Sequence, residues 1–217
     1  LGGKRHDRIP AYVSGLPGKT VAERAALAKE WMDRGFSALK FAGAVADAGE
    51  LVEMAAIRDA IGPGPKILVD LHWHYTALEA IRLIDQLCAY DLYLAEAPVA
   101  PEDIDGQAQV AASVRTLVGI GEELRTVHEY LPRFAKRCMN VIQPEIAHTG
   151  ITGMRRICEL AQAFHCTVMP HATINVGIVQ AASLHVAATL GNLAMQEYQH
   201  SIFDRNLSFL HTDMACA

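Results

Sequence analysis

Short apolar segments alternate with longer helix-like segments along the chain, and this alternation limits the folds that the chain can adopt. Eight segments have the length and apolar character of buried strands: residues 9–14, 37–41, 66–70, 92–96, 117–121, 139–143, 166–169 and 193–196. Seven helix-like segments follow the first seven of them. Such alternation predicts a parallel sheet with helical crossovers, and eight strands favour a closed barrel over an open sheet. We therefore expect an α/β fold with a TIM-like barrel of parallel strands.

The helix boundaries carry their own signals. Three helices are predicted to begin at a capping box, in which Ser or Thr is followed three residues later by Glu or Gln. The pairs are Thr20/Glu23, Thr76/Glu79 and Thr126/Glu129. The seventh helix is expected over residues 176–189, and no helix is expected after residue 207.

Charge and cysteine usage exclude several functions. The net charge is −5 and no run of Lys or Arg exceeds two residues, so nothing favours nucleic acid or an anionic membrane as a partner. No segment is predicted to be a signal peptide or a membrane span. The five cysteines are scattered without a CxxC motif, which is typical of reduced thiols in a cytoplasmic protein.

Three carboxylates close three successive predicted strands at an even interval. Asp70, Glu96 and Glu122 lie 26 residues apart, which is about the length of one βα unit summed from typical elements and loops. Residues at the carboxyl ends of parallel strands meet at one end of a barrel. The spacing therefore predicts a site for a hard divalent cation, which prefers oxygen ligands.

Titratable residues also close the next three strands. Glu145, His171 and Glu197 follow the sixth, seventh and eighth segments. Glu145 and His171 belong to neighbouring strands, and a carboxylate beside a histidine fixes its tautomer and raises its basicity. We interpret this pair as a general base with its orienting acid, against the alternative of a purely structural pair.

Three further residues are candidates for contact with a substrate. Lys40 lies inside an apolar strand and is expected to face the barrel mouth, where it would neutralise a substrate carboxylate or stabilise an anionic intermediate. His72 is expected to share a face with Asp70 and to stand beside the metal, since alternate strand residues point the same way. His148 lies just past the sixth strand.

As an ordered set, these residues resemble the barrel domain of the enolase superfamily, mandelate racemase subgroup. The resemblance rests on Lys40-Phe-Ala42, Val69-Asp70-Leu-His72, Ala95-Glu96-Ala-Pro98, Gly121-Glu122, Gln143-Pro144-Glu145, Met169-Pro170-His171 and Gln196-Glu197. It implies a (β/α)7β barrel and an N-terminal α+β capping domain that closes over the substrate. We expect that capping domain to be missing here, so that residues 1–217 form a single barrel domain truncated at both ends.

The resemblance also implies a chemistry. Mg²⁺ held by Asp70, Glu96 and Glu122 would bind a substrate carboxylate, and His171, oriented by Glu145, would take the α-proton. The resulting enediolate would be stabilised by the metal, by Lys40 and by Glu197 if that residue is protonated. His72 would act as the acid that helps a β-hydroxyl leave as water, as in the acid-sugar (galactonate-type) dehydratases. The product would be a 2-keto-3-deoxy acid.

Two departures from the family pattern bear on the reaction. The family's racemases usually read KxK on the second strand, and Ala42 stands at the position of the second lysine. The family's Asp on the sixth strand is Glu145 here. Without a base at position 42, a one-base dehydration fits better than a two-base racemisation.

Other functions stay open. A racemase, epimerase or cycloisomerase of the same superfamily would use the same enediolate. An unrelated metal barrel, such as a sugar isomerase or aldolase, would usually bring histidine among its ligands. An incomplete, non-catalytic barrel is the third alternative. The expected partner is an acid-sugar substrate, and the full-length protein is expected to be a homo-oligomer.

Overall fold

The computed structural model describes residues 1–172, 177–206 and 208 of the 217-residue chain, and its centre is one parallel sheet of eight strands. The strands are β1 (Ala11–Ser14), β2 (Ala38–Ala42), β3 (Lys66–Asp70), β4 (Leu92–Glu96), β5 (Leu117–Ile120), β6 (Val141–Ile142), β7 (Thr167–Val168) and β8 (Gln196–Gln199). Their order in the sheet is β7-β6-β5-β4-β3-β2-β1-β8. An isolated parallel bridge between Val168 and Leu193 links β7 to the segment that leads into β8. The sheet is therefore curled around a central axis, as a TIM-type barrel requires.

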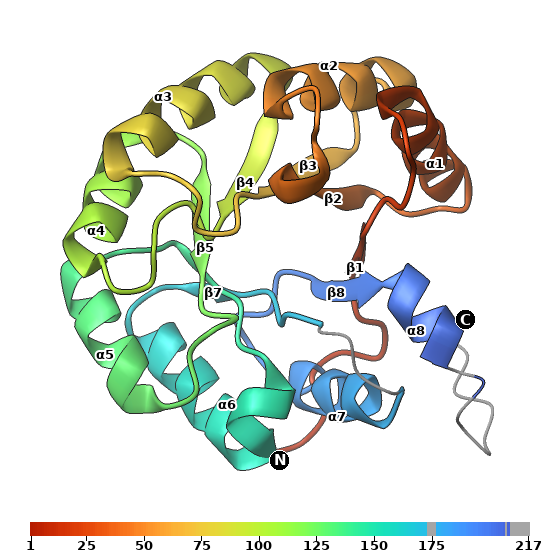
Figure 1. Ribbon diagram of the computed structural model, residues 1–217. Helices are drawn as coiled ribbons and strands as arrows, with labels where there is room; N and C mark the ends of the chain where they lie inside the picture. The colour runs from red at the N-terminus through yellow and green to blue at the C-terminus, as the bar shows by residue number, and fades with distance from the viewer. Residues whose placement is uncertain (173–176, 207, 209–217) are drawn as a thin grey trace.

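Helices surround the sheet and face it from outside (Figure 1). They are α1 (Val21–Asp33), α2 (Glu50–Ile61), α3 (Ala77–Leu87), α4 (Ile104–Ser113), α5 (Val127–Lys136), α6 (Ile146–Ala163), α7 (Gly177–Ala187) and α8 (His200–Asn206), with 3-10 turns η1 (Gly43–Val45) and η2 (Cys88–Tyr90). Thr20, Thr76 and Thr126 each form the capping box that the sequence predicts. Among the residues that the structure describes, no helix combines the length and the apolar character needed to cross a membrane.

Two apolar clusters hold these layers together. The larger one packs strand residues such as Ile67 and Val69 against helix residues such as Met54 and Ile84. The smaller one fills the inside of the curled sheet with Tyr12, Ala38, Leu68, Leu94, Val141, Met169 and Met195. These seven side chains, which lie on the strands or next to their ends, form an apolar floor beneath the carboxyl ends of the strands.

The eighth strand lies three residues later than the sequence predicts. The prediction was residues 193–196, whereas β8 pairs with β1 from Ala11↔Gln196 to Ser14↔Gln199. The strand is polar, and the buried side-chain amide of Gln196 forms hydrogen bonds with residues of other segments. Gln196 Nε2 donates to the Pro170 carbonyl at 3.3 Å, and Gln196 Oε1 accepts from Ser183 at 3.0 Å. Apolar character alone therefore misplaces this strand.

The helix count was also wrong. The described residues include an eighth helix, α8, directly after β8. The first residue of the predicted seventh helix, residue 176, lies outside the described residues, as do residue 207 and residues 209–217, where no helix was expected.

Candidate active site

The polar residues of the site stand one layer above the apolar floor of the barrel. In β3, Leu68 belongs to the floor and Asp70 lies two residues later, so both side chains face the axis. The same step of two residues beyond the floor gives Lys40, Glu96, Gln143, His171 and Glu197. Glu122 reaches this layer differently, because β5 ends at Ile120 and Gly121 turns the chain with a φ of 132°.

These side chains surround a cavity of about 630 Å³ at the carboxyl ends of the strands. Its lining includes Lys40, Asp70, His72, Glu122, His171 and Glu197. Six of the eight predicted site residues thus line the cavity, and a seventh, Glu145, contacts His171. The eighth, Glu96, lies beneath it and is bonded to Lys40.

Lys40 is buried between two carboxylates. Its Nζ lies 2.7 and 2.8 Å from the two oxygens of Glu96 and 3.0 Å from Glu197 Oε1. Burial would lower the pKa of Lys40, but Glu197 and Glu96 outweigh it and raise the pKa well above its usual value. The charged ammonium is therefore favoured at neutral pH, and it can offer positive charge to the cavity that it lines.

The predicted metal ligands crowd negative charge into a small volume. Asp70 and Glu96 are direct partners in the register of β3 and β4. Burial raises the pKa of Glu96 well above its usual value; Lys40 opposes the rise, while Asp70 and Glu122 add to it. Burial likewise raises the pKa of Asp70. Carboxylates held this close are stabilised by a cation, and oxygen donors suit a hard one.

One group of side chains has atoms close enough to share an ion. Single ligand atoms of Glu96, Glu122 and His171 lie within 4.8 Å of one another. Asp70 is not in this group, although it lines the same cavity. The arrangement thus brings two of the three predicted ligands together, with His171 close to them.

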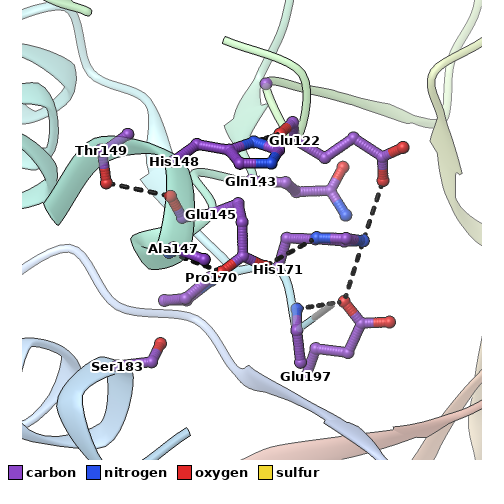
Figure 2. Close-up of polar contacts among 12 residues, drawn as sticks. Glu122, Gln143, Glu145, Ala147, His148, Thr149, Pro170, His171, Ser183 and Glu197 are labelled. Atoms are coloured by element: carbon purple, nitrogen blue, oxygen red, sulfur yellow. Dashed lines mark hydrogen bonds and ion pairs between the residues drawn. The ribbon is translucent and has the colours of Figure 1, made fainter. Parts of the chain in front are cut away.

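His171 is held from both sides of its ring, as Figure 2 shows. Its Nδ1 lies 3.1 Å from Glu145 Oε2, and its Nε2 lies 3.0 Å from Glu122 Oε2 and 3.8 Å from Glu197 Oε2. Burial would lower the pKa of His171, but the carboxylates of Glu197, Glu122 and Glu145 raise it well above its usual value. In this arrangement the imidazolium is favoured, because both nitrogens face acceptors.

Glu145 is fixed by the start of α6. The residue is fully buried at the N-terminal cap of the helix, where its Oε1 accepts from the Ala147 amide at 2.8 Å. An isolated bridge pairs the backbones of Glu145 and His171. The predicted pair is therefore present, and the longer Glu side chain still serves as a helix cap.

Glu197 was expected to stabilise the enediolate if protonated, but its surroundings favour the ionised form. Burial would raise its pKa, but Lys40 and His171 hold the pKa below its usual value. Its Oε2 also accepts from the Ala172 amide at 2.9 Å. Lys40, His171 and the Ala172 amide stabilise the ionised carboxylate of Glu197 and so oppose its protonation.

The reasoning that placed His72 was wrong, although His72 does line the cavity. β3 ends at Asp70, and His72 has a φ of 47°, so strand alternation does not reach it. Its backbone amide donates to Asp70 Oδ1 at 2.9 Å, and its side chain is exposed. A turn, and not a strand face, therefore brings His72 to the edge of the cavity.

Two other residues touch the site. His148 lines the cavity with its Nδ1 3.1 Å from the Glu122 carbonyl oxygen. Gln143 donates from Nε2 to Glu96 Oε2 at 2.5 Å, and the sequence analysis gave it no role. The available signal was its position directly after β6 and two residues before Glu145.

Comparison with known proteins agrees with this geometry. A family model described as Enolase C-terminal domain-like matches residues 23–215, and the chain belongs to this family. The resemblance to the enolase superfamily is thereby confirmed.

Curated relatives are enzymes with sugar-acid names. D-gluconate dehydratase of Thermoproteus tenax is 32% identical over 188 residues, which cover 79% of this chain and 37% of the relative. D-galactarolactone cycloisomerase of Agrobacterium fabrum is 28% identical over 195 residues, which cover 88% of this chain and 51% of the relative. The chain thus spans about half or less of the length of these relatives.

Solved structures show the same fold. A proposed isomerase from Sinorhizobium meliloti is 51% identical, with a TM-score of 0.96 over 99% of this chain and 56% of that one. A member of the enolase superfamily from Agrobacterium tumefaciens is 45% identical, with a TM-score of 0.95, and the match covers 99% of this chain and 55% of that one.

Proposed function

We propose that the full-length protein is a Mg²⁺-dependent dehydratase of an acid sugar and that residues 1–217 supply its (β/α)7β barrel domain. The observation that carries the proposal is the contact of His171 Nδ1 with Glu145 Oε2 at 3.1 Å, with Nε2 on the cavity side among carboxylates. Relatives named as dehydratases of gluconate and galactonate support the substrate class.

Asp70, Glu96 and Glu122 are the residues that would hold magnesium. Their carboxylate oxygens suit a hard cation, and a cation would offset the burial and the neighbouring acids that raise the pKa of Asp70 and Glu96. Bound Mg²⁺ would polarise the substrate carboxylate and offset the negative charge that raises the pKa of His171.

His171 is the proposed base. Glu145 accepts from Nδ1–H, so Nε2 is the nitrogen that takes the α-proton. The electrons of the broken C–H bond form the new C=C bond as the β-carbon loses its hydroxyl. That hydroxyl takes a proton from His72 and leaves as water, and the enol then becomes the 2-keto-3-deoxy acid. Lys40 offers positive charge to the substrate carboxylate as negative charge develops there.

An isomerase of the same superfamily is the second candidate. It is favoured by the 51% identity to the proposed isomerase and by the cycloisomerase among the curated relatives. Two-base racemisation is the weaker form of this candidate, because Ala42 lines the cavity where a second lysine would stand. A cycloisomerase needs the same base and a different fate for the enediolate.

A panel of acid sugars separates these candidates. The full-length protein with Mg²⁺ should form a 2-keto-3-deoxy acid from at least one of them, and H72N should lose this product while still exchanging the α-proton with solvent deuterium. The exposed His128 provides a matched control, so H128N should behave as the wild type. Exchange without water loss by the wild type would favour the isomerase. Absence of both Mg²⁺ binding and turnover would favour a non-catalytic barrel.

A further inference from the structure

Gln143 is a fully buried polar side chain for which the proposed reaction has no role. It follows the two-residue strand β6 and lies one layer above Val141 of the barrel floor. Its Nε2 donates to Glu96 Oε2 at 2.5 Å, so its amide crosses the intervening strand β5 to reach β4.

Gly119 makes this reach possible. It is the partner of Glu96 in the register of β4 and β5, so any side chain at position 119 would lie between Glu96 and Gln143. A Cβ built on Gly119 would stand 2.1 Å from Gln143 Oε1 and 3.0 Å from its Cδ. The missing side chain of Gly119 is the space that the Gln143 amide fills.

The other end of this amide is poorly satisfied. Gln143 Oε1 is buried without a hydrogen-bond partner among the described residues. Such an atom lowers the stability of a protein, and an apolar side chain of similar size would avoid the penalty. The hydrogen bond to Glu96 is therefore the contact through which this buried amide reaches the predicted metal ligands.

We propose that Gln143 is a positioning residue for the metal site. Its amide reaches Glu96 through the space that the missing side chain of Gly119 leaves open. Its amide binds Oε2 of Glu96, while Lys40 contacts both oxygens, so the amide distinguishes the two oxygens and orients the carboxylate toward a cation. Without the amide, Glu96 would keep its contacts with Lys40 but lose the hydrogen bond from Gln143 that fixes the orientation of its carboxylate. This inference rests on the magnesium site proposed above.

Titration calorimetry with Mg²⁺, together with thermal unfolding of the metal-free protein, tests this role. We expect Q143L to weaken Mg²⁺ binding about tenfold or more, as loss of a residue that orients a ligand usually does. We expect its metal-free unfolding temperature to stay the same or to rise, because the unpartnered oxygen is gone. G119A should weaken Mg²⁺ binding as well, and the double variant G119A/Q143L should bind no more weakly than the weaker single variant.

Gln107 provides the matched control. It is also fully buried, donates to the Ala100 carbonyl and accepts from Arg133, but it lies on α4, outside the barrel. We expect Q107L to lower the unfolding temperature and to leave the Kd for Mg²⁺ unchanged. If Q143L binds Mg²⁺ as the wild type does, the positioning role is refuted and the proposed function stands. If the wild type binds no Mg²⁺, both are refuted.

Discussion

At the scale of single residues, Lys40 is the charge on which the arrangement of the acids depends. Its ammonium touches Glu96 and Glu197, which come from opposite sides of the strand that carries it. Both carboxylates are buried, so each depends on a cation to remain ionised. Lys40 therefore contributes to folding as well as to the proposed reaction.

Replacing Lys40 should destabilise the metal-free protein strongly. Removing one partner of a buried ion pair typically costs about 3–5 kcal/mol, because the remaining charge stays buried. We expect K40M to lose about this much in urea unfolding and to recover part of it with Mg²⁺. K29M is the matched control, since Lys29 pairs with Asp33 on the surface and such pairs contribute about 1 kcal/mol or less. An equal loss in both variants would contradict the account.

Sequence reasoning identified these residues but not all of their contacts. Lys40, Glu145 and His171 were predictable because a charge inside or just after an apolar strand stands out. The role of Gln143 was not, because a neutral amide gives no such signal and its partner lies two strands away. His72 reached the cavity through a turn with positive φ, which a two-residue alternation cannot represent.

At the scale of elements, local signals decided how well each boundary was predicted. β3 and β4 have the predicted ends, and the three capping boxes mark the starts of α1, α3 and α5. The position of β8 was wrong because its buried polar residues draw their hydrogen bonds from other segments. Boundaries set by local hydrogen bonds can thus be predicted from the sequence. The hydrogen bonds that distant segments form with a buried polar strand cannot.

The capping box of α5 predicts an acid-dependent contribution to stability. Hydrogen bonds from the Thr126 hydroxyl and from backbone amides lower the pKa of Glu129. A folded-state pKa below the unfolded value of about 4.3 stabilises the protein above that pH, and the gain is lost as pH falls through the folded pKa. We expect T126A to cost about 1 kcal/mol at pH 7 in urea unfolding.

The contribution of the Glu129 carboxylate to this capping box can be tested separately. E129Q should be less stable than the wild type at neutral pH, and the difference should shrink below about pH 4. A difference that is constant with pH would show that the charge of Glu129 does not matter. Glu30, which is exposed on α1, offers a control position for the same substitution.

At the scale of the whole molecule, the curled sheet is what turns separate strands into a site. Residues more than a hundred positions apart, such as Lys40 and Glu197, meet because β2 and β8 both flank β1. The Val168–Leu193 bridge brings the end of the sheet order back toward β8. The sequence predicts this closure only through the count of strands, since no single residue encodes it.

Magnesium should therefore stabilise the whole fold. A ligand that binds only the folded state adds about 2.7 kcal/mol at a concentration one hundred times its Kd. We expect the unfolding free energy of the wild type to rise with Mg²⁺ and to return when a chelator removes the ion. E96Q and E122Q should lose most of this gain, whereas E30Q should keep it.

Release of deuterium from an α-deuterated acid sugar measures the proposed proton abstraction itself. The claim is that His171, oriented by Glu145, removes the α-proton of a carboxylate held at the strand ends. With Mg²⁺ and a substrate that the full-length protein turns over, we expect the wild type and H128N to release deuterium rapidly. We expect a loss of about 10²–10⁴-fold in H171N and a substantial loss in E145Q. Release by H171N at the wild-type rate would contradict this claim.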